Sequence, residues 1–208
     1  MGLIDISRTI SPETAVWPGD QEVEWTWTSR LNQENASVNL GSIRLSTHTA
    51  SHVDAPYHVS EEGRRTDDLP LSAFVGPARV VDVGGASTIR PEHVDGFTAE
   101  RVLFKTEASF LPDDEWPESV ASFEPDTIRR LADDGVILVG TDAPSVDPLE
   151  STSLPAHHAF REAGIVNVEG LCLANVSPGP YHLMALPLKI SGADAAPIRA
   201  VLRASGPE

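Results

Sequence analysis

The fold class is decided by the stretch Pro125-Asp126-Thr127-Ile128-Arg129-Arg130-Leu131-Ala132-Asp133-Asp134-Gly135-Val136-Ile137-Leu138-Val139. Proline fits the first turn of a helix, and Ile128, Leu131 and Ala132 fall on one helical face. Gly135 is typical of a helix end, and the four apolar residues after it predict a fully buried strand. A helix followed directly by a buried strand is typical of an α/β protein.

The same patterns extend to both sides of this stretch. A second helix is predicted over Pro155–Ala163, ended by Gly164. Alternating side chains predict that the strand over 43–47 is half-buried. With no internal repeat and no long linker, residues 1–208 are expected to form a single α/β domain whose mixed sheet is partly covered by two helices. The predicted strands are Ile43–Thr47, Ala78–Val83, Val102–Phe104, Val136–Val139, Leu171–Val176, Leu183–Ile190 and Ile198–Leu202.

Charge and composition exclude several classes of protein. The 208 residues contain 31 acidic and 15 basic side chains, a net charge of −16, which disfavours nucleic acid and anionic membrane surfaces as partners. No apolar run is long enough for a transmembrane helix, and the first residues lack the bases of a signal peptide. The lone Cys172 lies in an apolar run, which predicts a buried, inert thiol. We therefore expect a soluble cytoplasmic protein.

A cluster of polar residues lies in Thr47-His48-Thr49-Ala50-Ser51-His52-Val53-Asp54-Ala55-Pro56-Tyr57-His58. The histidines and the aspartate are separated by even numbers of residues, so extended chain places them on one face. Imidazole and carboxylate together suit zinc, manganese or iron. The alternative is a hydrogen-bonded polar edge without metal.

A weaker cluster contains His157, His158 and, further along the chain, Glu169. Adjacent helical residues point about 100° apart, so the two histidines cannot both face one metal. Spacing alone does not choose between them, and a surface helix without any ligand is the alternative interpretation.

Together these segments resemble the bacterial kynurenine formamidases of the cyclase family. The resemblance runs from Ile4 to Leu202 in the same order and with similar gaps, and the chain length fits. It implies a homodimer with a fold like the swivelling β/β/α domains, with a barrel-like sheet. The matching stretches are Ala15–Asp20, Thr47–His58, Pro70–Gly76, Gly140–Pro148, Leu154–Gly170 and Ala185–Lys189.

The resemblance also implies a site with two Zn²⁺ ions per chain, where Mn²⁺ or Co²⁺ is also accepted. His48, His52 and Asp54 would hold the first ion. Asp54 would bridge to the second, which His157 binds, and Glu169 would reach both. The family pattern matches His58 to the catalytic acid/base and Trp17 to an aromatic residue that contacts the substrate.

The implied reaction is hydrolysis of N-formyl-L-kynurenine to L-kynurenine and formate, an arylformamidase step of tryptophan degradation. Two alternatives are a metal-dependent cyclic-amide or lactone hydrolase like the isatin hydrolases, and a non-enzymatic protein that binds metal or a small molecule. A serine hydrolase is disfavoured because the sequence has no Gly-x-Ser-x-Gly.

Other candidate residues are expected to play structural roles. Ala50 stands where family members commonly carry glycine, so a positive φ there would cost stability. Asp142 is predicted to form a local turn. The remaining candidates are expected to be ordinary polar residues or aromatic cover; they are His93, His182, Trp25, Trp27 and Trp116.

Overall fold

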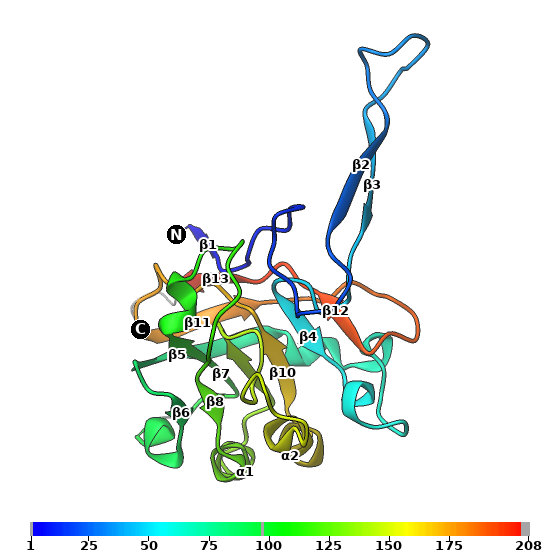
Figure 1. The fold of residues 1–208 in the computed structure, drawn as a ribbon. Helices are drawn as coiled ribbons and strands as arrows, with labels where there is room; N and C mark the ends of the chain where they lie inside the picture. Colours follow the sequence, from blue (N-terminus) through cyan, green and yellow to red (C-terminus); the bar gives the residue numbers. More distant parts are fainter. Residues whose placement is uncertain (1, 97, 205–208) are drawn as a thin grey trace.

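A large mixed sheet runs through the computed structural model, which describes residues 2–96 and 98–204. Its central strands β5, β7, β9 and β10 pair in parallel, and the outer strands pair antiparallel. The sheet curls in the view of Figure 1. In order across it, the strands are β1 (Leu3–Asp5), β13 (Val201–Ala204), β11 (Gly179–Met184), β5 (Val75–Gly84), β7 (Arg101–Thr106), β9 (Leu138–Thr141), β10 (Val166–Glu169), β4 (His52–Asp54) and β12 (Ala195–Pro197).

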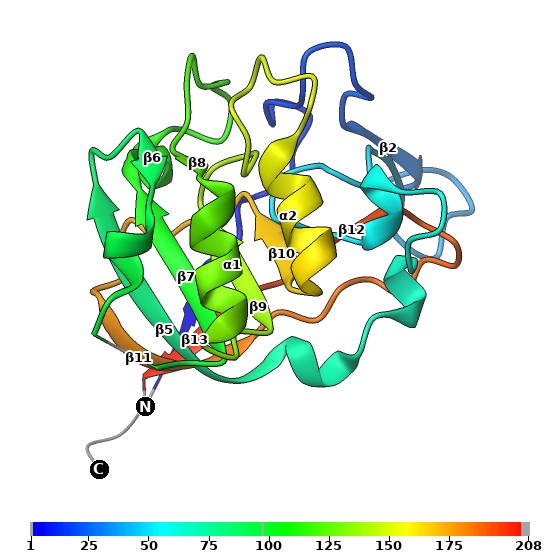
Figure 2. The same cartoon turned by 90° about the horizontal axis from the view of Figure 1, so that it is seen from below.

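Two α-helices, α1 (Pro125–Asp133) and α2 (Pro155–Ala163), lie side by side on one face of this sheet (Figure 2). The alternation of side chains along a strand divides the core between the two faces. In β7, Val102 and Phe104 pack with the helices, whereas Leu103 belongs to the cluster on the opposite face. The predicted α/β class, with a mixed sheet flanked by two helices, is confirmed.

A long hairpin stands out from the body of the molecule (Figure 1). Its strands, β2 (Glu24–Ser29) and β3 (Leu40–Arg44), form a two-stranded sheet of their own. A second small sheet joins β6 (Thr88–Ile89) to β8 (Ser122–Phe123). Short 3₁₀ helices complete the described elements; they are η1 (Pro56–Val59), η2 (Thr66–Asp68), η3 (Leu71–Ala73), η4 (Pro91–Val94) and η5 (Glu107–Phe110).

Elements with strong local signals agree with the sequence predictions. The predicted helix Pro155–Ala163 matches α2, and Gly164 follows it with φ 69°. The helix that begins at Pro125 matches α1, and the strands predicted at Ala78–Val83 and Val102–Phe104 lie inside β5 and β7. The strand predicted at Val136–Val139 begins two residues later, as β9.

Three predicted strands on the C-terminal side were wrong or only partly correct. Leu171–Val176 is not a strand, because Gly170 turns the chain at φ 67° directly after β10. The strand predicted at Leu183–Ile190 ends at Met184, before Pro187, which has no N–H to donate to a ladder. From Ile198–Leu202, only the last two residues belong to β13.

The strand predicted at Ile43–Thr47 ends at Arg44 as β3, and it is not half-buried. Ile43 is 50% exposed, because β3 pairs only with β2 in the projecting hairpin. None of the helices in the described ranges is long and apolar enough to cross a membrane.

Candidate metal centre

Strand β4 brings the first group of predicted residues together. His52 and Asp54 point to the same side of this strand, and Val53 points to the core between them. The even spacing therefore predicted their shared face correctly. His48 reaches the same point from the turn before β4, and His58 reaches it from η1.

Two further elements complete the centre. Strand β10 pairs antiparallel with β4 in a register that sets Glu169 opposite His52 and Asn167 opposite Asp54. Helix α2 begins at Pro155 and carries His157 in its first turn, with 8% of the residue exposed. His157 faces the centre, whereas its neighbour His158 is half-buried and makes no ion pair with the centre in the described ranges.

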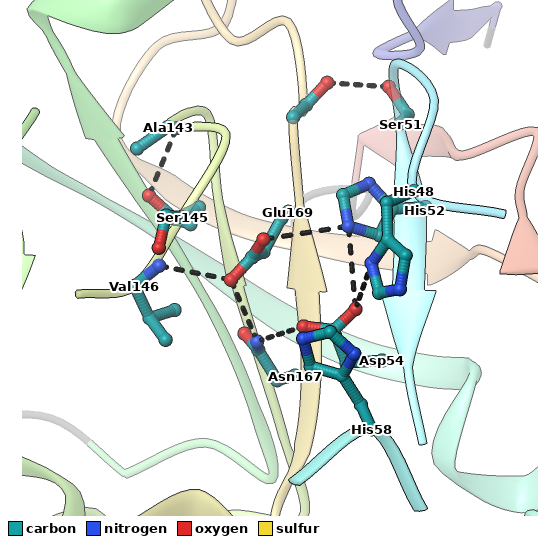
Figure 3. Close-up of polar contacts among 12 residues, drawn as sticks. His48, Ser51, His52, Asp54, His58, Ala143, Ser145, Val146, Asn167 and Glu169 are labelled. Atoms are coloured by element: carbon teal, nitrogen blue, oxygen red, sulfur yellow. Dashed lines mark hydrogen bonds and ion pairs between the residues drawn. The ribbon is translucent and has the colours of Figure 1, made fainter. Parts of the chain in front are cut away.

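The carboxylate of Asp54 lies in the middle of the cluster. Its Oδ1 is 3.1 Å from His48 Nδ1 and 3.4 Å from His52 Nε2, and its Oδ2 is 3.5 Å from His157 Nε2. Glu169 spans the same two sides, with Oε2 3.5 Å from His52 Nε2 and Oε1 3.5 Å from His157 Nε2. Figure 3 shows His48, His52 and Glu169 converging around Asp54.

The donor set fits a divalent cation. Two buried atoms that face each other, His52 Nε2 and Asp54 Oδ1, have no hydrogen-bond partner. A buried polar atom left unpaired costs about 1–3 kcal/mol, and a cation between nitrogen and carboxylate oxygens removes that cost. Ligand atoms of His52, Asp54 and Glu169 lie within 4.8 Å of one another, as do those of His48, Asp54 and His58.

Protons hold the cluster together when no cation does. Burial lowers the pKa of His48, His52 and His157, but the neighbouring carboxylates outweigh it and raise these values to about 9, 10 and 11. Burial raises the pKa of Asp54, but the neighbouring His157, His48 and His52 outweigh it and hold this pKa well below its usual range. Because a metal binds neutral imidazole, it must displace these protons.

An oxygen acceptor meets the outward-facing ring nitrogen of each of these three histidines. His48 Nε2 donates to Asp194 Oδ2 at 3.0 Å, His52 Nδ1 to the Ala50 carbonyl at 3.0 Å, and His157 Nδ1 to Asp147 Oδ2 at 2.7 Å. Such bonds fix the tautomer and the orientation of a ring that ligates metal. Sequence reasoning missed both aspartates, because neither belongs to a recognisable motif and Asp194 is far from His48 in the sequence.

Three residues around the cluster hold its side chains in place by hydrogen bonds: Asp147, Asn167 and, through its backbone, Val146. Asp147 accepts hydrogen bonds from the backbone N–H groups of Ala156 and His157 as well as from the His157 ring, so it ties the start of α2 to the centre. Asn167 Nδ2 donates to Asp54 and Glu169, and Val146 N donates to Glu169. These bonds orient the two central carboxylates (Figure 3).

The turn before β4 passes close to the end of β10. Ala50 has φ 58°, a positive value that the glycine of other family members at this position had suggested. Gly170 lies against it, and a Cβ at Gly170 would overlap the Ala50 carbonyl oxygen. Ser51 Oγ donates to the Gly170 carbonyl at 2.6 Å and joins the two segments. Ala50 thus has a left-handed backbone, and its own carbonyl accepts the hydrogen bond from His52.

A cavity of about 320 Å³ opens beside the centre, and His48, His52, His58 and His157 all line it. Trp17 lines its outer part and is 40% exposed. Trp116 also lines it and meets Trp17 edge-to-face, with ring centroids 5.4 Å apart. Trp116 was expected to be aromatic cover, and the structure places its ring in the wall of this cavity.

His58 lies between the centre and the cavity. Its ring centroid is 4.3 Å from that of His48 and 5.6 Å from that of His157, and its side chain is 29% exposed. Burial lowers its pKa, so the ring is neutral at pH 7 and able to accept a proton. His58 therefore faces both the proposed ligands and the space open to a small molecule.

Asp142 does not form the local turn that was predicted. It is fully buried and accepts hydrogen bonds from the backbone N–H and the hydroxyl groups of Thr106 and Ser109, more than thirty residues away. Burial raises its pKa. Cys172 was predicted to be buried in a strand. It is half-buried, and the chain around it is irregular.

His93 and His182 were expected to be ordinary polar residues, and the structure agrees, whereas Trp25 and Trp27 do not cover a core. His93 accepts a hydrogen bond from the Arg90 backbone, and His182 lies half-buried in β11. Trp25 and Trp27 lie on the projecting hairpin, 45% and 44% exposed, away from the residues that line the cavity.

Comparison with known proteins gives the class of protein that this fold and site define. The family model described as "Putative cyclase" matches residues 4–148, and the chain belongs to this family. It is 69% identical to a kynurenine formamidase of Salinibacter ruber, with 98% of each chain covered. It is 42% identical to a kynurenine formamidase of Geobacillus thermodenitrificans, again with 98% of each chain covered.

Solved structures agree in fold. A structure described as a potential metal-dependent hydrolase with cyclase activity superimposes with a TM-score of 0.84 at 30% identity and covers 99% of both chains. Isatin hydrolase A from Ralstonia solanacearum superimposes with a TM-score of 0.83 at 20% identity and covers 97% of this chain and 91% of its own. The latter likeness concerns the fold alone.

Proposed function

We propose that this chain is a metal-dependent kynurenine formamidase, which hydrolyses N-formyl-L-kynurenine to L-kynurenine and formate. One observation carries the proposal: His58 stands between a cluster of buried metal-binding groups and a cavity lined by aromatic rings. An arylformamide needs both features, because its aryl ring needs a flat surface and its amide bond needs polarisation and a proton donor. The identity to formamidases over the whole chain supports it further.

Two Zn²⁺ ions would bind, and the arrangement of Asp54 supports that number. Its Oδ1 faces His48 and His52, and its Oδ2 faces His157, so its two oxygens point at two groups of ligands. Glu169 reaches both groups in the same way. When bound, such a pair of ions lowers the pKa of water to about 7 and polarises a carbonyl oxygen. Mn²⁺ and Co²⁺ suit the same donors.

His58 would supply the proton that the leaving aryl amine needs. It is neutral at pH 7 and lies at the cavity wall, so it accepts a proton as water attacks the formyl carbon. It then donates that proton to the amine nitrogen as the C–N bond breaks. Trp17 would contact the aryl ring, and Trp116 would hold the Trp17 ring through the edge-to-face contact.

The proposal includes three further properties predicted from the sequence. We propose that residues 1–208 form one hydrolase domain, that the protein is cytoplasmic, and that it is a homodimer. The projecting hairpin supports the homodimer, because its apolar side chains are about half exposed and need cover. These side chains are Trp25, Trp27, Leu31, Val38, Leu40 and Ile43.

The deciding experiment measures turnover of N-formyl-L-kynurenine, isatin and a simple lactone side by side, with chelated and with zinc-reloaded protein. We expect the formamide to be the best substrate, activity to depend on reloading, and elemental analysis to give about two ions per chain. Preference for isatin or the lactone would favour the cyclic-amide or lactone hydrolase. Tight metal binding without turnover of any of the three would favour a binding protein.

A further inference from the structure

We propose that Asp194 is a positioning residue that orients both His48 and His58, an inference that rests on the proposed function of this site. Asp194 lies just before β12. One of its oxygens, Oδ2, is 3.0 Å from His48 Nε2 and 3.6 Å from His58 Nδ1. The other oxygen, Oδ1, accepts a hydrogen bond from Thr47 Oγ1 at 3.1 Å.

The chain around Asp194 is anchored independently of the histidines. The backbone N–H of Ala55, next to the central Asp54, donates to the Asp194 carbonyl at 2.8 Å. Thr66 N donates to the Ala193 carbonyl at 3.1 Å, and Gly192 N donates to Asp67 Oδ1 at 3.1 Å. The backbone that carries this carboxylate is thus anchored to Ala55, the residue after β4, and to Thr66 and Asp67 of η2.

For His48, this bond decides which ring nitrogen is available. Both ring nitrogens face carboxylate oxygens, Nδ1 that of Asp54 and Nε2 that of Asp194. A cation held with Asp54 would replace the proton on Nδ1, and the proton that stays on Nε2 donates to Asp194, because a carboxylate accepts hydrogen bonds and does not donate them. The lone pair then lies on Nδ1, which faces Asp54 Oδ1 at 3.1 Å, on the inner side of the cluster. Outer acceptors of this kind raise metal affinity about 10–100-fold in metalloproteins.

For His58, the same oxygen limits rotation of the ring. This side chain is the more exposed of the two and makes no hydrogen bond through Nε2 to any described residue. A small rotation closes the 3.6 Å separation to a hydrogen bond, and catalytic contacts are often long before substrate binds. Asp194 differs in this respect from Asp147 and the Ala50 carbonyl, each of which holds one histidine.

The test uses Asp194→Ala, Asp194→Asn and, as a matched control, Asp67→Ala. The control removes a carboxylate that ties down the same loop but contacts neither histidine. Zn²⁺ affinity is measured by competition with a chromophoric chelator. The kinetic constants kcat and KM are measured at saturating Zn²⁺, and ¹⁵N NMR of the zinc-loaded proteins gives the tautomers of the histidine rings.

We expect Asp194→Ala to weaken Zn²⁺ binding about 10–100-fold. We also expect it to lower kcat about tenfold or more at saturating zinc, with a smaller change in KM, since positioning of His58 acts on proton transfer. The ring nitrogens of both His48 and His58 should shift. Asp194→Asn should regain most of the zinc affinity, because its amide oxygen still accepts from His48 Nε2. Asp67→Ala should leave all three measurements near wild type.

Zinc binding and His48 ring shifts like those of wild type in both Asp194 variants would overturn the role toward His48. Unchanged kcat together with unchanged His58 ring shifts would overturn the role toward His58. Equal losses in Asp67→Ala would mean that the loop and not the carboxylate matters. If wild-type protein does not hydrolyse the formamide, the proposed function fails, while zinc competition and NMR still decide the role of Asp194.

Discussion

The candidate metal centre buries charged side chains, whereas the projecting hairpin exposes apolar ones. In the centre, Asp54 and Glu169 are 7% and 3% exposed, although carboxylates are rarely buried without a partner. In the hairpin, Trp25 and Trp27 are 45% and 44% exposed, although large aromatic side chains contribute most when they are covered. The proposed partners of the two regions differ in the same way, a cation for the centre and an apolar surface for the hairpin.

The two regions also differ in how they are held. Three elements of the body, β4, β10 and α2, fix the centre, and hydrogen bonds from Asn167 and Asp147 orient its charged groups. The hairpin is held by its own ladder and by an exposed ion pair between Arg44 and Glu24 at 3.4 Å. A lone two-stranded hairpin is marginally stable in water. The groups of the centre are therefore fixed by the body of the fold, whereas the hairpin depends on its own ladder.

The largest effect is expected at the junction of centre and cavity. His58→Ala should lower kcat by about 10²–10⁴, because it removes the proton donor, and should keep metal content and melting temperature. Steady-state kinetics, elemental analysis and a thermal melt on one variant decide the point. Metal loss in proportion to activity would make His58 a ligand, and near-normal turnover would leave the reaction without its acid.

Two neighbouring histidines give a matched test of which side chain belongs to the centre. His157→Ala should remove about one ion per chain, since it deletes the proposed ligand of the second ion; Asp147 keeps its two backbone hydrogen bonds, so α2 should stay in place. His158→Ala should change metal content little, because that ring lies outside the cluster. Elemental analysis after purification without chelator is the measurement. Equal losses from both variants would contradict the geometry of α2.

The hairpin is tested by changing its aromatic side chains alone. If it covers a second copy, the double variant Trp25→Ser/Trp27→Ser should weaken the dimer by about 2 kcal/mol or more, roughly a 30-fold rise in its dissociation constant. Zinc binding should stay unchanged, because the hairpin does not line the cavity or the centre. Analytical ultracentrifugation compares it with Leu71→Ser, a change of an apolar side chain that lies elsewhere on the surface and is 66% exposed. A wild-type monomer would contradict the homodimer.

The sequence predicted elements best where the signals are local. Pro125 and Gly135 bound a helix whose apolar face is visible in the sequence, and α1 and β9 follow it closely. The run Leu171–Val176 misled because Leu171, Leu173 and Val176 are buried although the chain leaves the sheet after β10, through a turn at Gly170 that packs against Ala50. The hairpin was missed for a similar reason, since alternation along the chain does not tell whether the apolar side finds a core.

For the site, the even spacing in β4 predicted that His52 and Asp54 share a face. The choice of His157 over His158 came from the family resemblance, and the burial of His157 agrees with it. Asp194 and Asn167 were out of reach, because their contacts with His48 and Asp54 join segments that only the fold brings together. Asp147 lies near His157 in the sequence, but no motif marks their pairing. The assigned ligand and catalytic roles stay predictions until the variants are measured.

Removal of the metal should make the stability of the protein depend on pH, because the histidines of the centre then bind protons. In the metal-free protein the pKa values of His48, His52 and His157 are about 9, 10 and 11, above the ordinary value of 6.5. Their protonation therefore contributes stability that is fully present below about pH 6.5 and is lost as pH rises through these values. The melting temperature of chelated protein should fall between about pH 7 and 10. The melting temperature of zinc-loaded protein should be higher and should fall less over the same pH range. Parallel curves of melting temperature against pH for the two forms would contradict a histidine metal site.

The smallest effect is expected at Ala50, where the turn that serves the centre is strained. Its φ of 58° is left-handed, which costs a residue with a Cβ about 1–2 kcal/mol and costs glycine almost nothing. Glycine also gives the unfolded chain more freedom, so Ala50→Gly should gain a net of about 1 kcal/mol, or about 2–4 °C in melting temperature for a chain of this length. Ala86→Gly, a half-buried position outside the residues with positive φ, should lose stability by a similar amount. Zinc affinity should stay within about twofold of wild type, because glycine keeps the carbonyl that accepts from His52. A destabilised Ala50→Gly would mean that the contacts of this Cβ outweigh the backbone strain, and weakened zinc binding would mean that the strained turn itself positions His52.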